Sequence, residues 1–316
     1  MEFNQERIHT IRRLAAVLET PVEFLESIAS KAGRFYSPFE LEGRQKPFAV
    51  KPASTRKRQI DNPVDPLRSL QKQINKRLLR NLAWPDHIHG GVKGRSIYDN
   101  GARHIGASRL VTIDIKRYFS NINNRNVFAI WFEVLGHSPE VASTLTRLTT
   151  FRRRLPQGAA TSPALANLFL FSIDEPLRIF CSSHGIQYST WIDDLAFSGP
   201  ESPKAIQFAA GVLANSRLGI SHRKLKIMSC MQQQLLTGLM VNETVRVPGK
   251  YLKDIRSGIH KLRSGLVSDA EKPLYLKSLL GRIEFAARTN VCRTASLQAE
   301  LINVLGDIKE LVDVDK

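Results

Sequence analysis

The sequence predicts an α+β fold in which helical segments surround a small antiparallel sheet. Apolar residues recur at helical spacing towards both ends of the chain and alternate in short runs near its centre. Two of these runs, Gln187–Trp191 and Leu195–Ser198, are separated by only three residues, as in a β-hairpin. The 316 residues and the 42% hydrophobic content are sufficient for a sizeable core divided into subdomains.

The first third of the chain combines helices with a basic hairpin. Helices are expected in residues 1–35, where Thr20, Pro21 and Glu23 form a helix-capping pattern. Residues 44–64 are basic and rich in proline, which favours a hairpin with a mobile connection. An amphipathic helix should follow, with its apolar face at Leu67, Leu70, Ile74, Leu78 and Leu82.

The rest of the chain alternates strands and helices before it becomes helical. A strand is expected at Leu110–Ile115, and a second hairpin at residues 234–248. Helices are expected at Asn126–Leu135, Pro139–Thr150, Ser162–Cys181 and Ala205–Arg217, and from Pro248 to the end. There is no internal repeat and no long linker.

Basic residues outnumber acidic ones, 46 to 29, which gives a net charge of +17. They are concentrated in two segments. Residues 44–80 contain 11 Lys and Arg against two acids, and residues 246–263 contain six against one. Such surfaces neutralise phosphates, so the layout favours nucleic-acid binding over a merely soluble basic protein.

Three widely spaced cysteines, Cys181, Cys230 and Cys292, indicate neither a disulfide framework nor a zinc site and fit a reducing cytoplasm. The first residues contain no apolar run typical of a signal peptide, and no stretch of about 18 apolar residues is present, so membrane insertion is not expected.

Two carboxylate positions are separated by 79 residues: Asp114 in an apolar strand, and the pair Asp193 and Asp194 at the bend of the hairpin. Taken singly, Asp114 could be a strand-end residue facing water, and the pair could reflect the preference of Asp for turns. A buried carboxylate requires a cation, and adjacent anions repel each other unless a divalent ion offsets them. With the segment LPQGAATSPALANL from Leu155 between them, they are the parts needed to hold two Mg²⁺ ions against a nucleoside triphosphate.

IDIKRYF, LPQGAATSPALANLFL and WIDD resemble motifs A, B and C of reverse transcriptases, in the same order and at similar spacing, and the match covers roughly residues 40–300. The resemblance implies a right-hand polymerase fold with fingers, a palm built on an antiparallel sheet, and a helical thumb. The implied boundaries are an N-terminal helical extension at 1–40, fingers at 41–109, a palm at 110–240 with fingers helices inserted at about 120–160, and a thumb at 241–316.

The resemblance also implies catalytic roles. Asp114 and Asp193 would hold two Mg²⁺ ions, assisted by the Ile115 carbonyl, with Asp194 as the neighbouring carboxylate and dNTPs as substrates. One ion would lower the pKa of the primer hydroxyl, and the other would neutralise the pyrophosphate leaving group.

Further residues match positions that contact the nucleotide or its template. Phe119 would be a steric gate against ribonucleotides, or alternatively a plain core residue. Gln157 and Gly158 match the turn that lines the nucleotide pocket, and Lys224 lies where the family offers a basic residue that protonates pyrophosphate. Arg58, with Lys51, Arg56 or Lys57 nearby, would grip triphosphate or template through phosphate oxygens. The other interpretation of these charges is a solvated loop.

HGGVKGRSIYDNGARHIG, at residues 89–106, resembles the segment before motif A in retron reverse transcriptases. Asn100–His104 approximates their NAxxH element and Leu236–Gly238 their VTG element. The departures are Gly101 for Ala, Leu236 for Val, and Trp191-Ile192 for the Tyr-Ala that usually precedes the Asp pair. No maturase, endonuclease or RNase H-like extension is expected.

A retron enzyme would bind its own structured non-coding RNA, prime from the 2′-OH of an internal guanosine, and produce a branched RNA-linked DNA. A separate effector protein and a role in anti-phage defence are implied as well. The residues expected to contact nucleic acid are His89, Lys93, Arg95, Asn100, His104, Lys250, Lys253, Arg256 and Lys261. Two alternatives remain open: another bacterial reverse transcriptase, of abortive-infection or group II intron-like type with conventional priming, and a catalytically idle RNA-binding scaffold.

Overall fold

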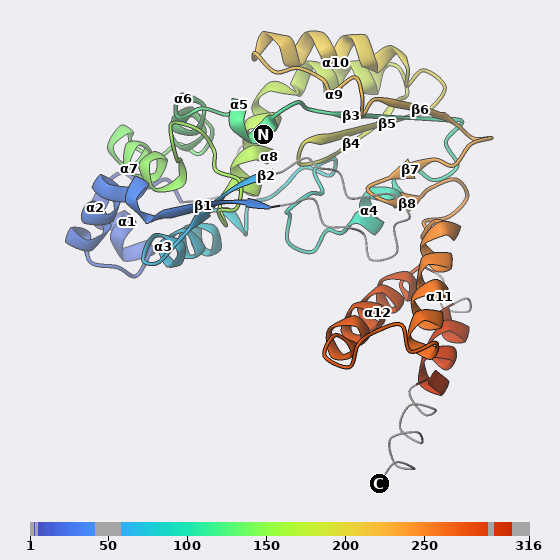
Figure 1. Ribbon diagram of the computed structural model, residues 1–316. Helices are drawn as coiled ribbons and strands as arrows, with labels where there is room; N and C mark the ends of the chain where they lie inside the picture. The colour runs from blue at the N-terminus through green and yellow to red at the C-terminus, as the bar shows by residue number, and fades with distance from the viewer. Residues whose placement is uncertain (1–2, 4–5, 42–57, 290–293, 305–316) are drawn as a thin grey trace.

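The computed structural model describes residue 3 and residues 6–41, 58–289 and 294–304. In this part of the chain, a four-stranded antiparallel sheet is packed among helices, and a separate group of helices lies at the C-terminal end (Figure 1). This mixture of helices and an antiparallel sheet agrees with the predicted α+β class.

The central sheet has the strand order β4-β5-β3-β6. Its strands are β3 (Arg109–Asp114), β4 (Gln187–Trp191), β5 (Asp194–Ser198) and β6 (Lys226–Ser229), and every neighbouring pair is antiparallel. Because side chains alternate along a strand, Val111 and Ile113 lie on one face of β3, and Thr112 and Asp114 lie on the other. The predicted strand and the first hairpin of the sheet are confirmed to within one residue.

Helices α8 (Ser162–Ile173), α9 (Glu175–Ser183) and α10 (Lys204–Asn215) pack on the face that carries Val111 and Ile113, and α9 and α10 are seen above the sheet in Figure 1. The single helix expected over Ser162–Cys181 is wrong. The chain divides at Asp174 because Pro176, in the first turn of α9, cannot donate to the preceding helix.

The N-terminal helices share the main core with the sheet. These elements are α1 (Ile11–Val17), α2 (Val22–Lys31), the 3₁₀ turn Ala32–Phe35, α3 (Leu67–Ile74) with a π turn at Asn75–Leu79, α5 (Tyr118–Asn121), α6 (Asn124–Ala129) with a π turn at Ile130–Val134, and α7 (Pro139–Thr149). The predicted apolar face of the third helix is confirmed, since its five positions from Leu67 to Leu82 are all buried. The predicted capping role of Thr20 is wrong, because Pro21 itself is the residue before α2 and no side chain caps that helix.

The basic hairpin begins earlier than the sequence suggested. Strands β1 (Tyr36–Leu41) and β2 (Arg58–Pro63) pair antiparallel, with Tyr36 opposite Pro63 and Leu41 opposite Arg58. Residues 44–57 of the expected hairpin lie outside the described residues.

The C-terminal helices have a core of their own. Helix α11 (Gly249–Arg263) packs against α12 (Lys272–Ala287), and residues 294–304 are also helical (Figure 1). The predicted second hairpin is reduced to β7 (Leu235–Leu236) and β8 (Leu239–Met240). Helix α4 (Ile97–Ala102) connects the two cores, because Tyr98 donates a hydrogen bond to the carbonyl of Phe285.

Among the described residues, every helix is too short or too polar to span a membrane.

Candidate active site

The sheet brings the two carboxylate positions of the sequence together. In the β3–β5 register, Asp114 at the end of β3 lies directly opposite Asp194 at the start of β5. Asp193 occupies the two-residue turn between β4 and β5, and its carbonyl accepts a hydrogen bond from the Ile115 amide at 2.9 Å. The other turn residue, Ile192, has a φ of +60°, which is unfavourable for a β-branched side chain. The packing around the turn therefore holds a strained backbone.

Negative charge at this site is only partly compensated. Burial, followed by the neighbouring Asp193 and Asp114, raises the pKa of Asp194 to about 6, while Lys224 acts in the opposite direction. The Lys224 ammonium forms an ion pair with Asp114, which is 7% exposed. Within the described residues, no three His, Cys, Asp or Glu side chains form a group already arranged around a metal ion. In this structure, the cation that pairs with Asp114 is therefore the Lys224 ammonium and not a metal ion.

The loop that carries Lys224 is fixed to the end of β3. The Ser221 amide donates to the Asp114 carbonyl at 2.8 Å, and the Lys116 amide donates to the Gly219 carbonyl at 2.7 Å. Lys224 lies 110 residues from Asp114 in the sequence, so only the fold places its ammonium on that carboxylate.

The Leu155–Gly158 segment docks on β2. The Asp61 amide donates to the Gln157 carbonyl at 2.8 Å, and the Arg154 guanidinium is 3.4 Å from the Asp61 carboxylate. Gly158 has a φ of +124°, and a Cβ there would lie 3.0 Å from the Ile60 side chain. Gln157 and Gly158 are thus brought beside the strand that contains Arg58. The Arg58 side chain and residues Lys51, Arg56 and Lys57 lie outside the described part of the chain.

Phe119 is half-buried, with its ring 6.1 Å from that of Tyr118 in an edge-to-face contact. Tyr118 is fully buried and donates to the Ala166 carbonyl at 2.7 Å. Part of the Phe119 ring belongs to the core and part is accessible, so both a packing role and a gating role fit its position.

The segment His89-Gly90-Gly91 packs against the strained Ile192-Asp193 turn. Backbone hydrogen bonds join Thr190 to the carbonyl of His87 and to the amide of His89, and Asn167 of α8 donates to the Gly90 carbonyl at 2.7 Å. A Cβ on Gly90 would come within 2.7 Å of the Ile192 backbone nitrogen. Sequence reasoning missed Gly90 and Asn167 as supporting residues, although the Gly-Gly pair was a signal of close backbone approach.

Asn100 and His104 are buried, which corrects the expectation that they contact nucleic acid directly. The Ser189 hydroxyl donates to Asn100 Oδ1 at 2.7 Å, so it accepts from His104 Nε2, also at 2.7 Å. His104 Nδ1 is then left to accept from Ser198 Oγ at 2.7 Å. Burial lowers the pKa of His104 to about 3, so the ring is neutral and links α4 to both strands of the hairpin.

Two further expectations are corrected in the same segment. His89 is 4% exposed, and burial lowers its pKa to about 4. Arg95 donates to the backbone carbonyls of Trp84, Pro85 and Ile88, so its guanidinium is engaged within the chain. Lys93 is exposed and remains accessible.

On α11 the expected basic residues are exposed. Ile255, Ile259 and Leu262 face the C-terminal core, and the opposite side of the helix carries Lys250, Lys253, Arg256 and Lys261. These four residues are more than 50 positions from the carboxylate turn in the sequence, and they belong to the other core.

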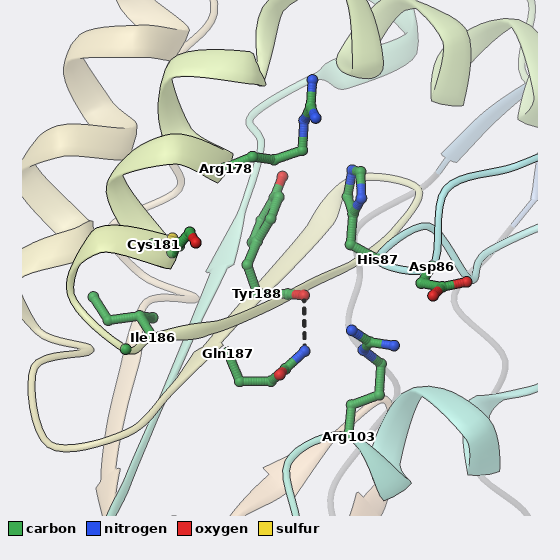
Figure 2. Close-up of a pocket in the computed structure, with 10 residues that line it drawn as sticks. Asp86, His87, Arg103, Arg178, Cys181, Ile186, Gln187 and Tyr188 are labelled. Atoms are coloured by element: carbon green, nitrogen blue, oxygen red, sulfur yellow. Dashed lines mark hydrogen bonds between the residues drawn. The ribbon is translucent and has the colours of Figure 1, made fainter. Parts of the chain in front are cut away.

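A pocket of about 520 Å³ lies at the end of β4 that is remote from the carboxylates (Figure 2). Asp174, which is 1% exposed, binds His87 at 3.0 Å and Arg178 at 2.9 Å, and it accepts from the Tyr188 hydroxyl at 3.3 Å. Three side chains of the pocket wall are therefore anchored to one buried carboxylate, and Arg103 lies across the opening beside Gln187 (Figure 2).

Comparison with known proteins agrees with this geometry. Residues 49–263 match the family described as reverse transcriptase (RNA-dependent DNA polymerase). The chain is 28% identical over 253 residues to the retron Se72 reverse transcriptase of Salmonella heidelberg (strain 579083-10), covering 77% of this chain and 64% of that protein. It is 31% identical over 220 residues to the retron Ec86 reverse transcriptase of Escherichia coli, covering 68% of each.

A third relative, the retron Mx65 reverse transcriptase of Myxococcus xanthus, is 28% identical over 235 residues, which is 68% of this chain and 55% of that protein. The chain thus spans between about half and two thirds of the length of these relatives. The chain belongs to the reverse transcriptase (RNA-dependent DNA polymerase) family and is of the retron type.

Proposed function

We propose that the protein is the RNA-directed DNA polymerase of a retron and copies part of its own structured non-coding RNA into a branched, RNA-linked single-stranded DNA. The observation that carries the proposal is the β3–β5 register, which sets Asp194 opposite Asp114 with Asp193 in the adjoining turn. Names of relatives with 31% and 28% identity support the retron assignment.

The donor chemistry of the residues present suits two Mg²⁺ ions, although in the described part of the chain the carboxylates are not yet gathered into a metal-holding group. Asp114, Asp193 and Asp194 would hold them with the Ile115 carbonyl, because hard oxygen ligands suit this ion. The raised pKa of Asp194 indicates charge that a cation would stabilise. For Asp114 to serve as a metal ligand, its ion pair with Lys224 would have to open. When bound, the ions lower the pKa of the attacking hydroxyl and neutralise the departing pyrophosphate.

Other side chains would select and orient the dNTP. Gln157 and Gly158 line the nucleotide pocket, and Arg58 of the adjoining strand grips the triphosphate. The half-buried Phe119 excludes a ribose 2′-OH. Lys224, once released from Asp114, would give a proton from Nζ to pyrophosphate.

The elements fit a right-hand division with the boundaries at 1–40, 41–109, 110–240 and 241–316. On this proposal, β1 and β2 belong to the fingers, the four-stranded sheet is the palm, and α11 and α12 form the thumb. The exposed basic side of α11 then follows the backbone of an RNA duplex.

Synthesis would begin at the 2′-OH of a guanosine within the RNA, in the bacterial cytoplasm. The product would act with a separate effector protein in defence against phage. The alternative reverse transcriptase types differ in priming from a conventional 3′-OH.

The test is to express the protein with its native flanking DNA and to extract the nucleic acid that copurifies. After RNase treatment, the sample is run on a denaturing gel with and without debranching enzyme. We expect a discrete single-stranded DNA whose mobility shifts on debranching. Absence of this DNA, together with dNTP incorporation on an added RNA template and primer, would retain the polymerase and reject the retron. Absence of both would reject the polymerase.

A further inference from the structure

A third basic region lies between the two carboxylate positions, and no role has been given above to its exposed Lys and Arg residues. Residues 115–173 contain seven Lys and Arg but only two acids, Glu133 and Glu140. The turn Arg152-Arg153, between α7 and α8, is the most unusual part of it, since both residues are exposed and both have positive φ, +48° and +62°.

This turn is a tight two-residue hairpin. Phe151 and Arg154 exchange backbone hydrogen bonds, at 2.9 Å from the Phe151 amide and 3.0 Å from the Arg154 amide. Turns with two left-handed central residues strongly prefer sequences such as Asn-Gly, because other side chains are strained there. Two arginines in succession are therefore unfavourable for the turn itself, and strain of this kind is typically stored at functional positions.

The surroundings hold the strained turn in place. The Phe151 ring stacks on Tyr36 with centroids 4.2 Å apart, and the Arg152 guanidinium lies 5.1 Å from the centroid of the same Phe151 ring. On the other side, Arg154 pairs with Asp61, and the Asn124 amide donates to the Arg153 carbonyl at 3.1 Å. The guanidinium of Arg152 is thus pre-ordered on an aromatic surface rather than free to sample solvent.

The charge of this turn is not compensated locally. No carboxylate in the described residues forms a salt bridge with Arg152 or Arg153, and exposed Arg125 adds a third positive charge at the start of α6, beside the turn. The planar fork of a guanidinium matches phosphate oxygens, and pre-ordering reduces the entropy lost on binding.

We propose that the Arg152-Arg153 turn is a phosphate-binding site for the single-stranded RNA template as it approaches the active site. This inference rests on the proposed polymerase function and extends it. Arg153 precedes Gln157 by four residues, so the turn lies within about 14 Å of the nucleotide pocket. At that distance, it meets the template a few nucleotides ahead of the position being copied.

The decisive variant combines Arg152→Asn with Arg153→Gly. It gives the turn the pair of residues that its backbone prefers, so the melting temperature should equal or exceed that of the parent protein, while two phosphate-binding charges are lost. The probe is a fluorescent RNA template annealed to a DNA primer, with or without a single-stranded 5′ overhang, and affinity is measured by anisotropy over a range of salt concentrations.

We expect affinity for the overhanging template to fall about tenfold, and the slope of log Kd against log salt to decrease by about 1.4, since two contacts to a single strand are lost. Blunt duplex should bind as before. The double variant Arg152→Lys with Arg153→Lys should retain most of the affinity because it keeps both charges.

The matched control is Arg217→Gly, compared with the single variant Arg153→Gly. Arg217 is also exposed, also has positive φ at +57°, and follows the end of α10. Unchanged affinity and salt slope in the Arg152→Asn, Arg153→Gly variant would overturn the proposal, as would an equal loss on blunt duplex or in Arg217→Gly. A parent protein that binds the template but incorporates no dNTP would instead count against the polymerase function.

Discussion

The two ends of the β4–β5 hairpin differ in how their polar side chains are partnered. At the turn, Asp193 and Asp194 join Asp114, and one lysine opposes their charge. Away from the turn, Ser189 and Ser198 are bound by a single neutral imidazole, that of His104. The first end gathers three carboxylates, and burial together with their mutual repulsion raises the pKa of Asp194. The second has a hydrogen-bonding partner for each of these three side chains.

This difference separates residues for chemistry from residues for structure. Buried polar groups that satisfy one another rigidify a fold, whereas like charges held together indicate a site that is completed by something else. From sequence, the three aspartates and His104 were all expected to be functional, whereas the two serines were not singled out. The hydrogen-bond and ion-pair partners of a side chain in the folded protein distinguish a ligand-binding residue from a structural one.

The largest expected effect is at the charged end. Replacing both Asp193→Asn and Asp194→Asn should reduce DNA synthesis by at least about 10³-fold, because neutral amide oxygens hold divalent ions far more weakly than carboxylates, while RNA binding stays largely intact. Primer extension and a binding assay measure the two properties. The matched control is Asp86→Asn, which changes a highly exposed aspartate on the rim of the remote pocket and should have little effect. Full activity in the double variant would refute the catalytic assignment.

At the other end, His104→Ala should lower the free energy of unfolding by about 3 kcal/mol. The substitution removes the hydrogen bonds that the imidazole makes to Ser189 and Ser198, of which Ser189 still has Asn100, and it opens a cavity beside α4. RNA affinity of the folded protein should change little. Chemical denaturation and RNA binding below the unfolding transition check this. Parent-like stability with weakened RNA binding would instead restore the direct nucleic-acid contact expected from sequence.

The pH dependence of stability sharpens the same contrast. The pKa of His104 is about 3 in the fold and near 6.5 when unfolded, so the unfolded state takes up the proton first. The contribution of neutral His104 to the free energy of unfolding is fully present above pH 6.5. As the pH falls towards 3, this contribution is lost at up to about 1.4 kcal/mol per pH unit. His104→Gln should show a shallower decline between pH 6.5 and 5, measured by urea denaturation. Identical slopes in the two proteins would contradict a buried neutral histidine.

The smallest effect is expected for Phe119, at the margin of the charged end. Phe119→Ala should admit ribonucleotides about tenfold more readily relative to deoxynucleotides, a change of about 1.4 kcal/mol in discrimination. Competition between the two substrates in a primer-extension assay measures it. Unchanged discrimination together with reduced stability would assign Phe119 to core packing.

The sequence determined those features that depend on local pattern. Alternation defined β3 and the β4–β5 hairpin, helical periodicity defined the apolar face from Leu67 to Leu82, and spacing identified Asp114, Asp193 and Asp194 as a set. These succeed because periodicity and short-range order follow from backbone geometry. The long helix over 162–181 failed because one proline outweighed a continuous apolar run.

Tertiary structure alone decided which polar residues are buried and what they touch. Nothing local distinguishes His104, which is enclosed between two serines, from exposed Lys93 in the same segment. The contact between Lys224 and Asp114 spans 110 residues, and the strained arginine turn persists only because Tyr36 and Asp61 hold its flanks. Burial and long-range pairing depend on how elements pack together, and that information is distributed over the whole chain rather than written in any one segment.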